Sequence, residues 1–157
     1  NGRSVHDSID ALASIRAHIT YGPMLHGSRL AFMGYSNGGA LALSLVACAP
    51  DFAGLYVSYF APNDYPQLWT EEPLIRSALE TLLGGNPTAQ PNAYAARSTR
   101  LSVAQQLATM RRKQGPKLIL LHDSEDSVTN MESSIETLDR LIESLDEVVG
   151  QVEEAAT

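Results

Sequence analysis

The sequence of 157 residues contains one cysteine, Cys48, and it lacks a long uninterrupted apolar run. A single thiol excludes an internal disulfide and a zinc site built on cysteines, and it leaves the compartment open, with the cytoplasm slightly favoured. The longest stretch without charge, residues 31–50, reaches the length of a membrane helix. Glycine and polar residues interrupt it between positions 34 and 39, so we expect no membrane span.

Positive charge is also scarce, because 11 lysines and arginines stand against 18 aspartates and glutamates, a formal net charge of −7. Residues 131–157 contain eight acidic side chains and one basic one, Arg140, so this segment accounts for the whole excess. The rest of the chain is neutral. A chain without a basic face is a poor partner for nucleic acid or for acidic lipid surfaces, and we expect it to bind neither.

The length and the 44% hydrophobic content suffice for one domain with a core. Apolar spacing predicts an amphipathic helix over residues 5–20, with a capping box at Ser4 and Asp7, and a second long helix capped by Asn130. Apolar strands are predicted over residues 29–34, 54–60 and 117–122, and a helix buried nearly all round over residues 37–49. Because helices alternate with strands, we expect a three-layer α/β/α domain with a mainly parallel sheet.

Residues 61–113 are less regular and carry five prolines, which indicates an insertion between the second and third strands. We predict one helix from Pro73 to a stop at Gly84, and another over residues 102–113 that ends in three basic residues. An insertion in this place often shapes a binding site. Candidates for lining a pocket are Tyr35, Tyr65 and Trp69. The alternative role of the aromatic residues in the insertion is to pack it onto the core.

The segment Gly34-Tyr35-Ser36-Asn37-Gly38 lies between a predicted strand and a predicted helix. This is the context of a nucleophile elbow, in which a serine stands at the apex of a strained turn. Glycines two residues to either side avoid collisions with the backbone or with a substrate. The helix that follows would place the backbone N–H of Asn37 where an oxyanion forms. The alternative interpretation is a glycine turn whose serine only caps the helix.

An acidic loop, residues 122–128, follows the third predicted strand. Because the carboxyl ends of parallel strands meet at one edge of a sheet, we expect this loop near Ser36, where a carboxylate could orient an imidazole. Asp123, Glu125 and Asp126 compete for that role. A metal site is the weaker interpretation, because converging ligands elsewhere in the chain are lacking. We therefore expect neither a metal nor another cofactor.

With these two motifs the chain resembles the α/β-hydrolase superfamily, in particular its prolyl-oligopeptidase-like and dienelactone-hydrolase-like branches. The resemblance extends over about residues 4–149 and rests on the segments GYSNGG, LLGGNPTAQPNAYAARS and LILLHDSED. It implies that Ser36 is the nucleophile, the N–H of Asn37 an oxyanion donor and Asp126 the acid of a catalytic triad. The chain departs from the family pattern at three positions, with Asp123 in place of a frequent glycine and Thr99 and Asn130 in place of frequent prolines.

The superfamily places the base histidine after the acid, but no histidine follows Asp126 in this sequence. The four histidines all precede it: His122 is a weak substitute, His6 and His18 fit solvated or capping roles on the first helix, and His26 lies in a loop. The strands that would precede the first helix, one of which leads to the second oxyanion donor, are missing as well. We therefore expect residues 1–157 to be one partial hydrolase domain, lacking the first strands and the histidine-bearing end, and to be inactive alone.

Two classes of function follow. The first is a serine hydrolase that cleaves an ester, thioester or amide of a small acyl or peptide substrate through an acyl-enzyme on Ser36, with the histidine supplied from outside the chain. A thioesterase-type domain cut from a larger synthase is a variant of this class. The alternative is a non-catalytic, truncated hydrolase fold that binds or assembles with a partner. Three strands expose two sheet edges, which favours self-association or pairing with another chain.

Overall fold

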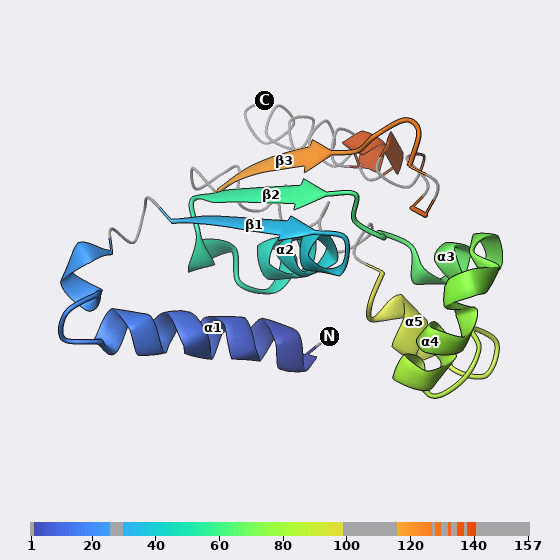
Figure 1. Ribbon diagram of the computed structural model, residues 1–157, viewed down its shortest axis with the longest axis horizontal. Coiled ribbons are helices and arrows are strands. Elements are labelled where there is room, and N and C mark those ends of the chain that lie inside the picture. Colours follow the sequence, from blue (N-terminus) through green and yellow to red (C-terminus); the bar gives the residue numbers. More distant parts are fainter. Residues whose placement is uncertain are drawn as a thin grey trace, which may run out of the picture.

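The fold is built on a short parallel sheet. The computed structural model describes residues 2–25, 30–98, 116–126, 128–129, 132, 135–136 and 138–140. Within them, the sheet has the order β1-β2-β3, with strands β1 (Ala31–Tyr35), β2 (Leu55–Tyr59) and β3 (Lys117–Leu121). All three strands run in the same direction, and Tyr35, Tyr59 and Leu121 lie side by side at their carboxyl ends (Figure 1). The predicted α/β class with a parallel sheet is confirmed, and each strand agrees with its predicted range to within two residues.

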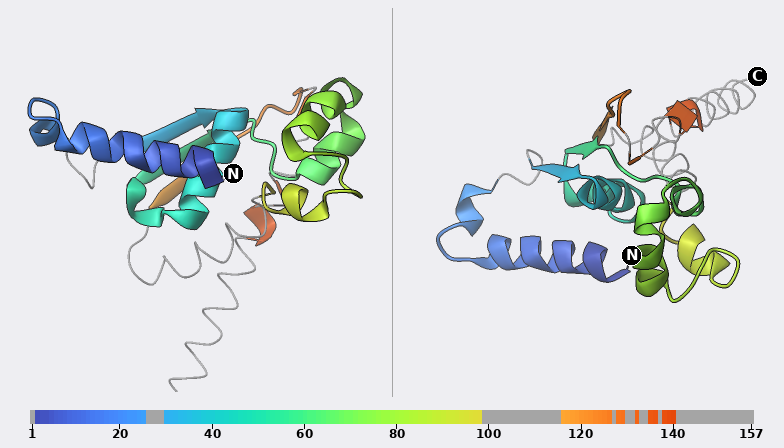
Figure 2. Two further views of the ribbon diagram at one scale, coloured as in Figure 1. Left: turned by 90° about the horizontal axis from the view of Figure 1, so that it is seen from below. Right: turned by 45° about the vertical axis from the view of Figure 1, so that its right-hand side comes forward.

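One face of the sheet is covered by helices α1 (Gly2–Ala17) and α2 (Asn37–Cys48), which lie beside each other (Figure 2). Val5 of α1 and Leu45 of α2 pack with Tyr56 of β2 in one apolar cluster. Eight of the twelve residues of α2 are buried, as predicted for a helix covered nearly all round. Burial of these apolar side chains is the main force that holds α2 against the sheet.

The other face of the sheet carries exposed apolar side chains in the described part of the chain. Side chains alternate between faces along a strand, so residues at matching register positions form rows across the sheet. One row contains Met33 and Ile119, which are 64% and 43% exposed, and the next contains Tyr35 and Leu121, which are 66% and 38% exposed. Val57 lies between Met33 and Ile119 in the first row and is buried, so the exposed apolar side chains of that row belong to the two outer strands. Exposed apolar side chains grouped in this way are typical of a surface that contacts other protein.

The ends of α1 differ from the prediction. The helix begins at Gly2, so Ser4 lies inside it, and the predicted capping box is wrong. The carbonyl of Ser4 instead accepts a hydrogen bond from Ser8 Oγ at 2.9 Å. The helix ends three residues early, at Ala17, where the next residue, His18, accepts hydrogen bonds at Nδ1 from the N–H groups of Thr20 and Tyr21 at 3.2 and 3.4 Å. His18 Nδ1 thus shapes the turn after α1 and, as an acceptor, caps no carbonyl group of the helix.

The insertion contains three helices in its described part, α3 (Tyr65–Glu71), α4 (Pro73–Leu83) and α5 (Pro91–Ala95). Only α4 was predicted, and it ends as expected at Gly84, which adopts a left-handed φ of 83°. Helices α3 and α5 each carry a proline in their first turn, where the missing N–H removes no helical hydrogen bond. The prolines therefore begin helices here. All three helices lie beyond the carboxyl ends of the strands (Figure 1).

The remaining elements are short. Two 3₁₀ helices, η1 (Gly22–Met24) and η3 (Pro50–Phe52), connect the longer ones. The described residues between 132 and 140 are helical, in agreement with the helix predicted after Asn130, while the helix predicted over residues 102–113 lies outside the described residues. None of the helices described is both long and apolar enough to cross a membrane.

Gly39 of α2 packs closely against the end of β2. A Cβ at this position would lie 2.8 Å from the carbonyl oxygen of Tyr59 and 3.0 Å from Ser58 Oγ. We expect Gly39→Ala to lower the free energy of unfolding by about 1–3 kcal/mol, because the helix must move away from the strand. Gly38→Ala is the matched control, since no atom lies within 4 Å of its added Cβ. Urea unfolding that leaves both variants equally stable would contradict this close packing.

Candidate active site

Ser36 forms the turn between β1 and α2. Its backbone has φ 51° and ψ −118°, a conformation that non-glycine residues rarely adopt and that costs about 1–3 kcal/mol. Two hydrogen bonds fix the turn: the N–H of Ser36 donates to the carbonyl of Tyr59 at 2.9 Å, and the N–H of Ala40 donates to the carbonyl of Ser36 at 3.1 Å. Ser36 itself is exposed. The turn therefore presents an exposed hydroxyl at the N-terminus of a buried helix.

The glycines around Ser36 differ in whether the surrounding atoms leave room for a side chain. A Cβ on Gly34 would lie 1.8 Å from the carbonyl oxygen of Gly38, so the tight turn accepts glycine alone at position 34. A Cβ on Gly38 would meet no atom within 4 Å, so the protein's own packing does not require glycine there. Gly39, which the motif does not include, is the second glycine that packing demands. The expected collision with the backbone thus holds at position 34 but not at position 38, where collision with a substrate stays a prediction, and it also holds at position 39.

Asp126 lies in the loop after β3 and its carboxylate is held by three donors. Oδ1 accepts hydrogen bonds from the N–H groups of Val128 and Thr129 at 2.8 and 3.2 Å, and Oδ2 accepts one from Thr129 Oγ1. His122 Nε2 lies 3.5 Å from Oδ2, and the Asp126 side chain is 16% exposed. Burial alone would raise the pKa of Asp126, but these hydrogen bonds and His122 outweigh it and hold the pKa below the usual 3.8. The carboxylate is therefore ionised at neutral pH.

This lowered pKa predicts how stability depends on pH. A carboxyl group whose pKa is lower in the folded than in the unfolded state stabilises the fold above its unfolded pKa, and this contribution is lost as the pH falls through the folded pKa. We expect Thr129→Val, which removes the hydroxyl donor, to lower the free energy of unfolding at pH 7 by about 1–3 kcal/mol. The difference from the parent protein should shrink as the pH falls through the pKa of Asp126. Urea unfolding between pH 7 and acid pH measures it, and a difference independent of pH would refute the role of the hydroxyl.

The other two acids of the loop have different surroundings. Asp123 Oδ1 accepts a hydrogen bond from the N–H of Glu125 at 2.9 Å, and the carbonyl of Asp123 accepts one from the N–H of Asp126 at 3.1 Å. Asp123 therefore shapes the turn that leads to Asp126. Glu125 is exposed. Of the three acids, the geometry favours Asp126 as the one held in a fixed orientation.

Ser36 and Asp126 line the same cavity, which has a volume of about 340 Å³. The remaining lining comes from the ends of all three strands and the acidic loop, and consists of Tyr35, Phe60, Asp123, Val128 and Thr129. Tyr35, one of the predicted pocket residues, stacks on Tyr59 with ring centroids 5.6 Å apart. The acidic loop therefore lies near Ser36, as predicted from the parallel arrangement of the strands.

Phe60 and Thr129 also line this cavity, and neither is among the site residues predicted from the sequence. Phe60 directly follows β2 and has a φ of 49°; it and Ser36 are the non-glycine residues with positive φ in the described part of the chain. The N–H of Phe60 donates to the carbonyl of Leu121 at 2.9 Å, and its own carbonyl lies 3.3 Å from Thr129 Oγ1. Strained backbone conformations concentrate at functional sites. A hydroxyl three residues after an aspartate was the available signal for Thr129, while no sequence signal marks Phe60.

Tyr65 and Trp69, the other predicted pocket residues, are not part of this lining. Tyr65 is 2% exposed and belongs to the core cluster against which Trp69 packs. Trp69 Nε1 donates to Glu80 Oε1 at 3.0 Å, and the guanidinium of Arg76 lies 4.9 Å from its ring centroid. Both aromatic residues thus take the alternative role, which is to pack the insertion onto the core.

The histidines that precede Asp126 are the ones that could replace the base within this chain. The side chain of His122 is 5% exposed, its Nε2 lies 2.7 Å from the carbonyl oxygen of Thr129, and its ring meets Phe60 edge to face. It supports the acidic loop and does not belong to the lining around Ser36, which disfavours it as a substitute base. His6 lies on α1, far along the chain from the site, and His26 falls outside the described residues.

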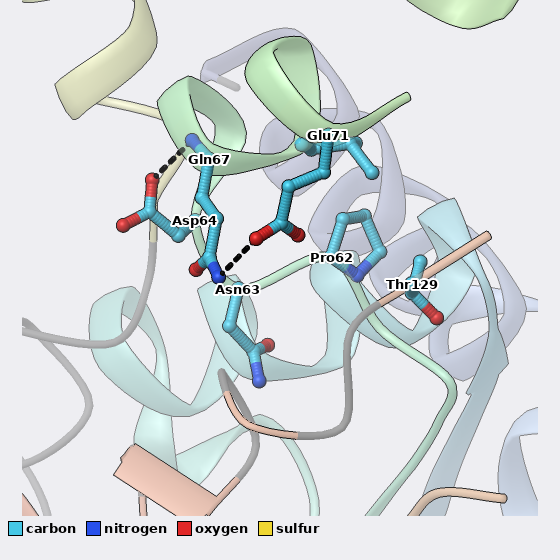
Figure 3. A pocket seen from close by; sticks show the side chains of 7 residues that line it. Pro62, Asn63, Asp64, Gln67, Glu71 and Thr129 are labelled. Carbon is cyan, nitrogen blue, oxygen red and sulfur yellow. Dashed lines mark hydrogen bonds between the residues drawn. The ribbon is translucent and has the colours of Figure 1, made fainter. Parts of the chain in front are cut away.

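A second hollow, of about 10 Å³, lies between the start of α3 and Thr129 (Figure 3). Its volume suits about one water molecule. The carboxylates around it already serve α3: Asp64 Oδ1 accepts the N–H of Gln67 at 3.0 Å, and Glu71 Oε1 accepts Gln67 Nε2 at 2.9 Å. Among the residues that the structure describes, no three histidines, cysteines or acids are placed to hold a metal ion.

Comparison with known proteins identifies the fold and the family. In fold the chain is similar to a puromycin-hydrolyzing peptidase from Mycobacterium tuberculosis, with a TM-score of 0.65 and 23% identity over 88% of this chain. The matched part is 20% of that peptidase, so this chain spans about a fifth of its length. No curated protein sequence matches the chain. Residues 3–156, nearly the whole sequence, match the prolyl oligopeptidase family, and the chain therefore belongs to that family.

Proposed function

We propose that the complete protein containing this chain is a serine hydrolase, which cleaves an ester, thioester or amide through an acyl-enzyme on Ser36. The observation that carries the proposal is the exposed, strained Ser36 at the start of α2, in one cavity with the fixed carboxylate of Asp126. Membership of the prolyl oligopeptidase family supports it. The similar peptidase hydrolyses puromycin, which supports amides as one of the substrate classes.

In this proposal Ser36 Oγ attacks the acyl carbonyl carbon while a histidine removes its proton. The negative charge on the carbonyl oxygen is stabilised by the N–H of Asn37, one of the first N–H groups of α2, which have no acceptor within the helix. The histidine then gives the proton to the leaving group, and water releases the acyl group from Ser36. Asp126 orients the histidine and stabilises its charged form. The histidine comes from residues outside these 157.

Hydrolysis of p-nitrophenyl acetate by the complete protein tests this proposal. An acyl-enzyme predicts a burst of p-nitrophenol that approaches one molecule per protein molecule before slower turnover. Ser36→Ala should remove the burst. Ser77→Ala, on the exposed side of α4, should keep it. A folded complete protein that releases no p-nitrophenol faster than buffer would contradict the proposed function.

A second candidate function, a non-catalytic module that assembles with a partner, is favoured by the apolar face of the sheet that carries Met33, Tyr35, Ile119 and Leu121. Strands β1 and β3 are also the edges of the described sheet and offer unpaired backbone groups. Residues 1–157 alone are then expected to associate. Light scattering that finds a stable monomer at micromolar concentration would count against this candidate.

A further inference from the structure

Tyr65, the first residue of α3, links the insertion to the turn that carries Ser36. Its side chain is buried, with 2% of the residue exposed, yet its hydroxyl reaches the exposed residue Asn37. Tyr65 OH donates a hydrogen bond to Asn37 Oδ1 at 3.1 Å. Asn37 directly follows Ser36 and is the first residue of α2. One hydrogen bond therefore joins the insertion to the beginning of the helix behind Ser36.

Tyr65, near the beginning of the insertion, is held by residues at the end of its described part. Its N–H donates to Ser98 Oγ at 3.0 Å, and Ser98 Oγ donates in turn to the carbonyl of Tyr94 at 3.0 Å. The guanidinium of Arg97 lies 5.9 Å from the centroid of its ring. Burial raises the pKa of the Tyr65 phenol and Arg97 opposes that rise, so the hydroxyl stays protonated at neutral pH and remains a donor. These contacts leave the phenol little freedom to turn away from Asn37.

The side chain of Ser36 does not cap α2. Serine at the N-cap position normally accepts a hydrogen bond from an N–H in the first turn, but the side chain of Ser36 makes no such bond. A hydroxyl engaged in capping would be less available as a nucleophile. Asn37 is the residue next to it, and its side chain is fixed by Tyr65 from outside the helix.

We propose that Tyr65 is a positioning residue, which holds Asn37 so that its backbone N–H faces the oxyanion. The inference rests on the proposed hydrolase function. An N–H that is held in place in advance stabilises charge that develops only in the transition state. Loss of the hydroxyl should therefore slow acylation of Ser36 and leave the affinity for the substrate unchanged.

The test compares Tyr65→Phe, Asn37→Ala and the double variant in the complete protein, with p-nitrophenyl acetate as the substrate. Asn37→Ala keeps the backbone N–H but removes the acceptor of the hydrogen bond. We expect Tyr65→Phe to lower the maximal burst rate about tenfold, with an unchanged substrate concentration for half-maximal burst rate; this effect is smaller than removal of a direct oxyanion donor. If Tyr65 acts through Asn37, the double variant should be no slower than Asn37→Ala alone.

Tyr94→Phe is the matched control. Tyr94 lies fully buried in the same core cluster, and its hydroxyl has no hydrogen-bond partner among the residues that the structure describes. This variant should acylate at the parent rate. Suppose that the parent protein shows a burst. If Tyr65→Phe then acylates at the parent rate, or if the rate losses of the two single variants multiply in the double variant, the role of Tyr65 is overturned while the proposed function stands. If the folded parent protein releases p-nitrophenol no faster than buffer, the proposed function is overturned and this inference falls with it.

Discussion

Asp126→Asn is expected to slow acylation in the complete protein by about 10⁴-fold, the size of the loss when an asparagine replaces the acid of a serine hydrolase triad. Asparagine keeps the shape of the side chain, and its Oδ1 can still accept from the N–H groups of Val128 and Thr129. Its amide nitrogen, however, replaces the oxygen that now accepts the Thr129 hydroxyl. An amide N–H cannot accept a hydrogen bond from the histidine, so the imidazole would lose both its orientation and the stabilising charge.

The burst rate with p-nitrophenyl acetate measures this loss, and Asp123→Asn provides the comparison. Asp123 lines the same cavity, but its carboxylate is used to accept the N–H of Glu125 within the turn. We expect its replacement to reduce the rate by less than about tenfold, in line with loss of a charge that touches neither nucleophile nor base. A larger loss in Asp123→Asn than in Asp126→Asn would assign the acid to Asp123.

Gly34→Ala is expected to lower the free energy of unfolding by at least about 3 kcal/mol, the largest effect of any single methyl group considered. The added Cβ would lie 1.8 Å from the carbonyl oxygen of Gly38 and 2.1 Å from its carbonyl carbon. Both are backbone atoms, so no side chain can move aside. Either the end of β1 or the first turn of α2 must shift, and the conformation of Ser36 would be lost with it.

Thermal unfolding followed by circular dichroism checks this prediction. For a domain of this size a loss of 3 kcal/mol corresponds to a fall in Tm of roughly 6–12 °C. Gly38→Ala should unfold close to the parent, because its added Cβ meets no atom within 4 Å. A Gly34→Ala protein with the Tm of the parent would refute the close approach of the two glycines.

Much of the fold could be predicted because it depends on local patterns. The strands are short apolar runs, and α2 is apolar all round, so their number, order and parallel arrangement followed from periodicity and alternation. The glycine spacing around Ser36 likewise predicted a strained turn between strand and helix, and the angles of Ser36 agree with it. The parallel arrangement then brought the acidic loop to the same edge of the sheet.

What escaped prediction depends on contacts between distant parts of the chain. The need for glycine at position 39 comes from the carbonyl of Tyr59, which belongs to another strand. The carbonyl oxygen of Phe60, a residue with a positive φ, lies 3.3 Å from the hydroxyl oxygen of Thr129, 69 residues further along the chain. The helices α3 and α5 escaped because prolines were treated as breaks, although a proline in the first turn is compatible with a helix.

Labelling with a fluorophosphonate probe tests most directly whether Ser36 is a nucleophile. The complete folded protein is treated with the probe and digested, and the modified peptide is identified by mass spectrometry. We predict one phosphonyl group, on the peptide that contains Ser36, and no labelling of Ser36→Ala. A folded protein that stays unlabelled, or that carries the probe on a different serine, would contradict the proposed role of Ser36.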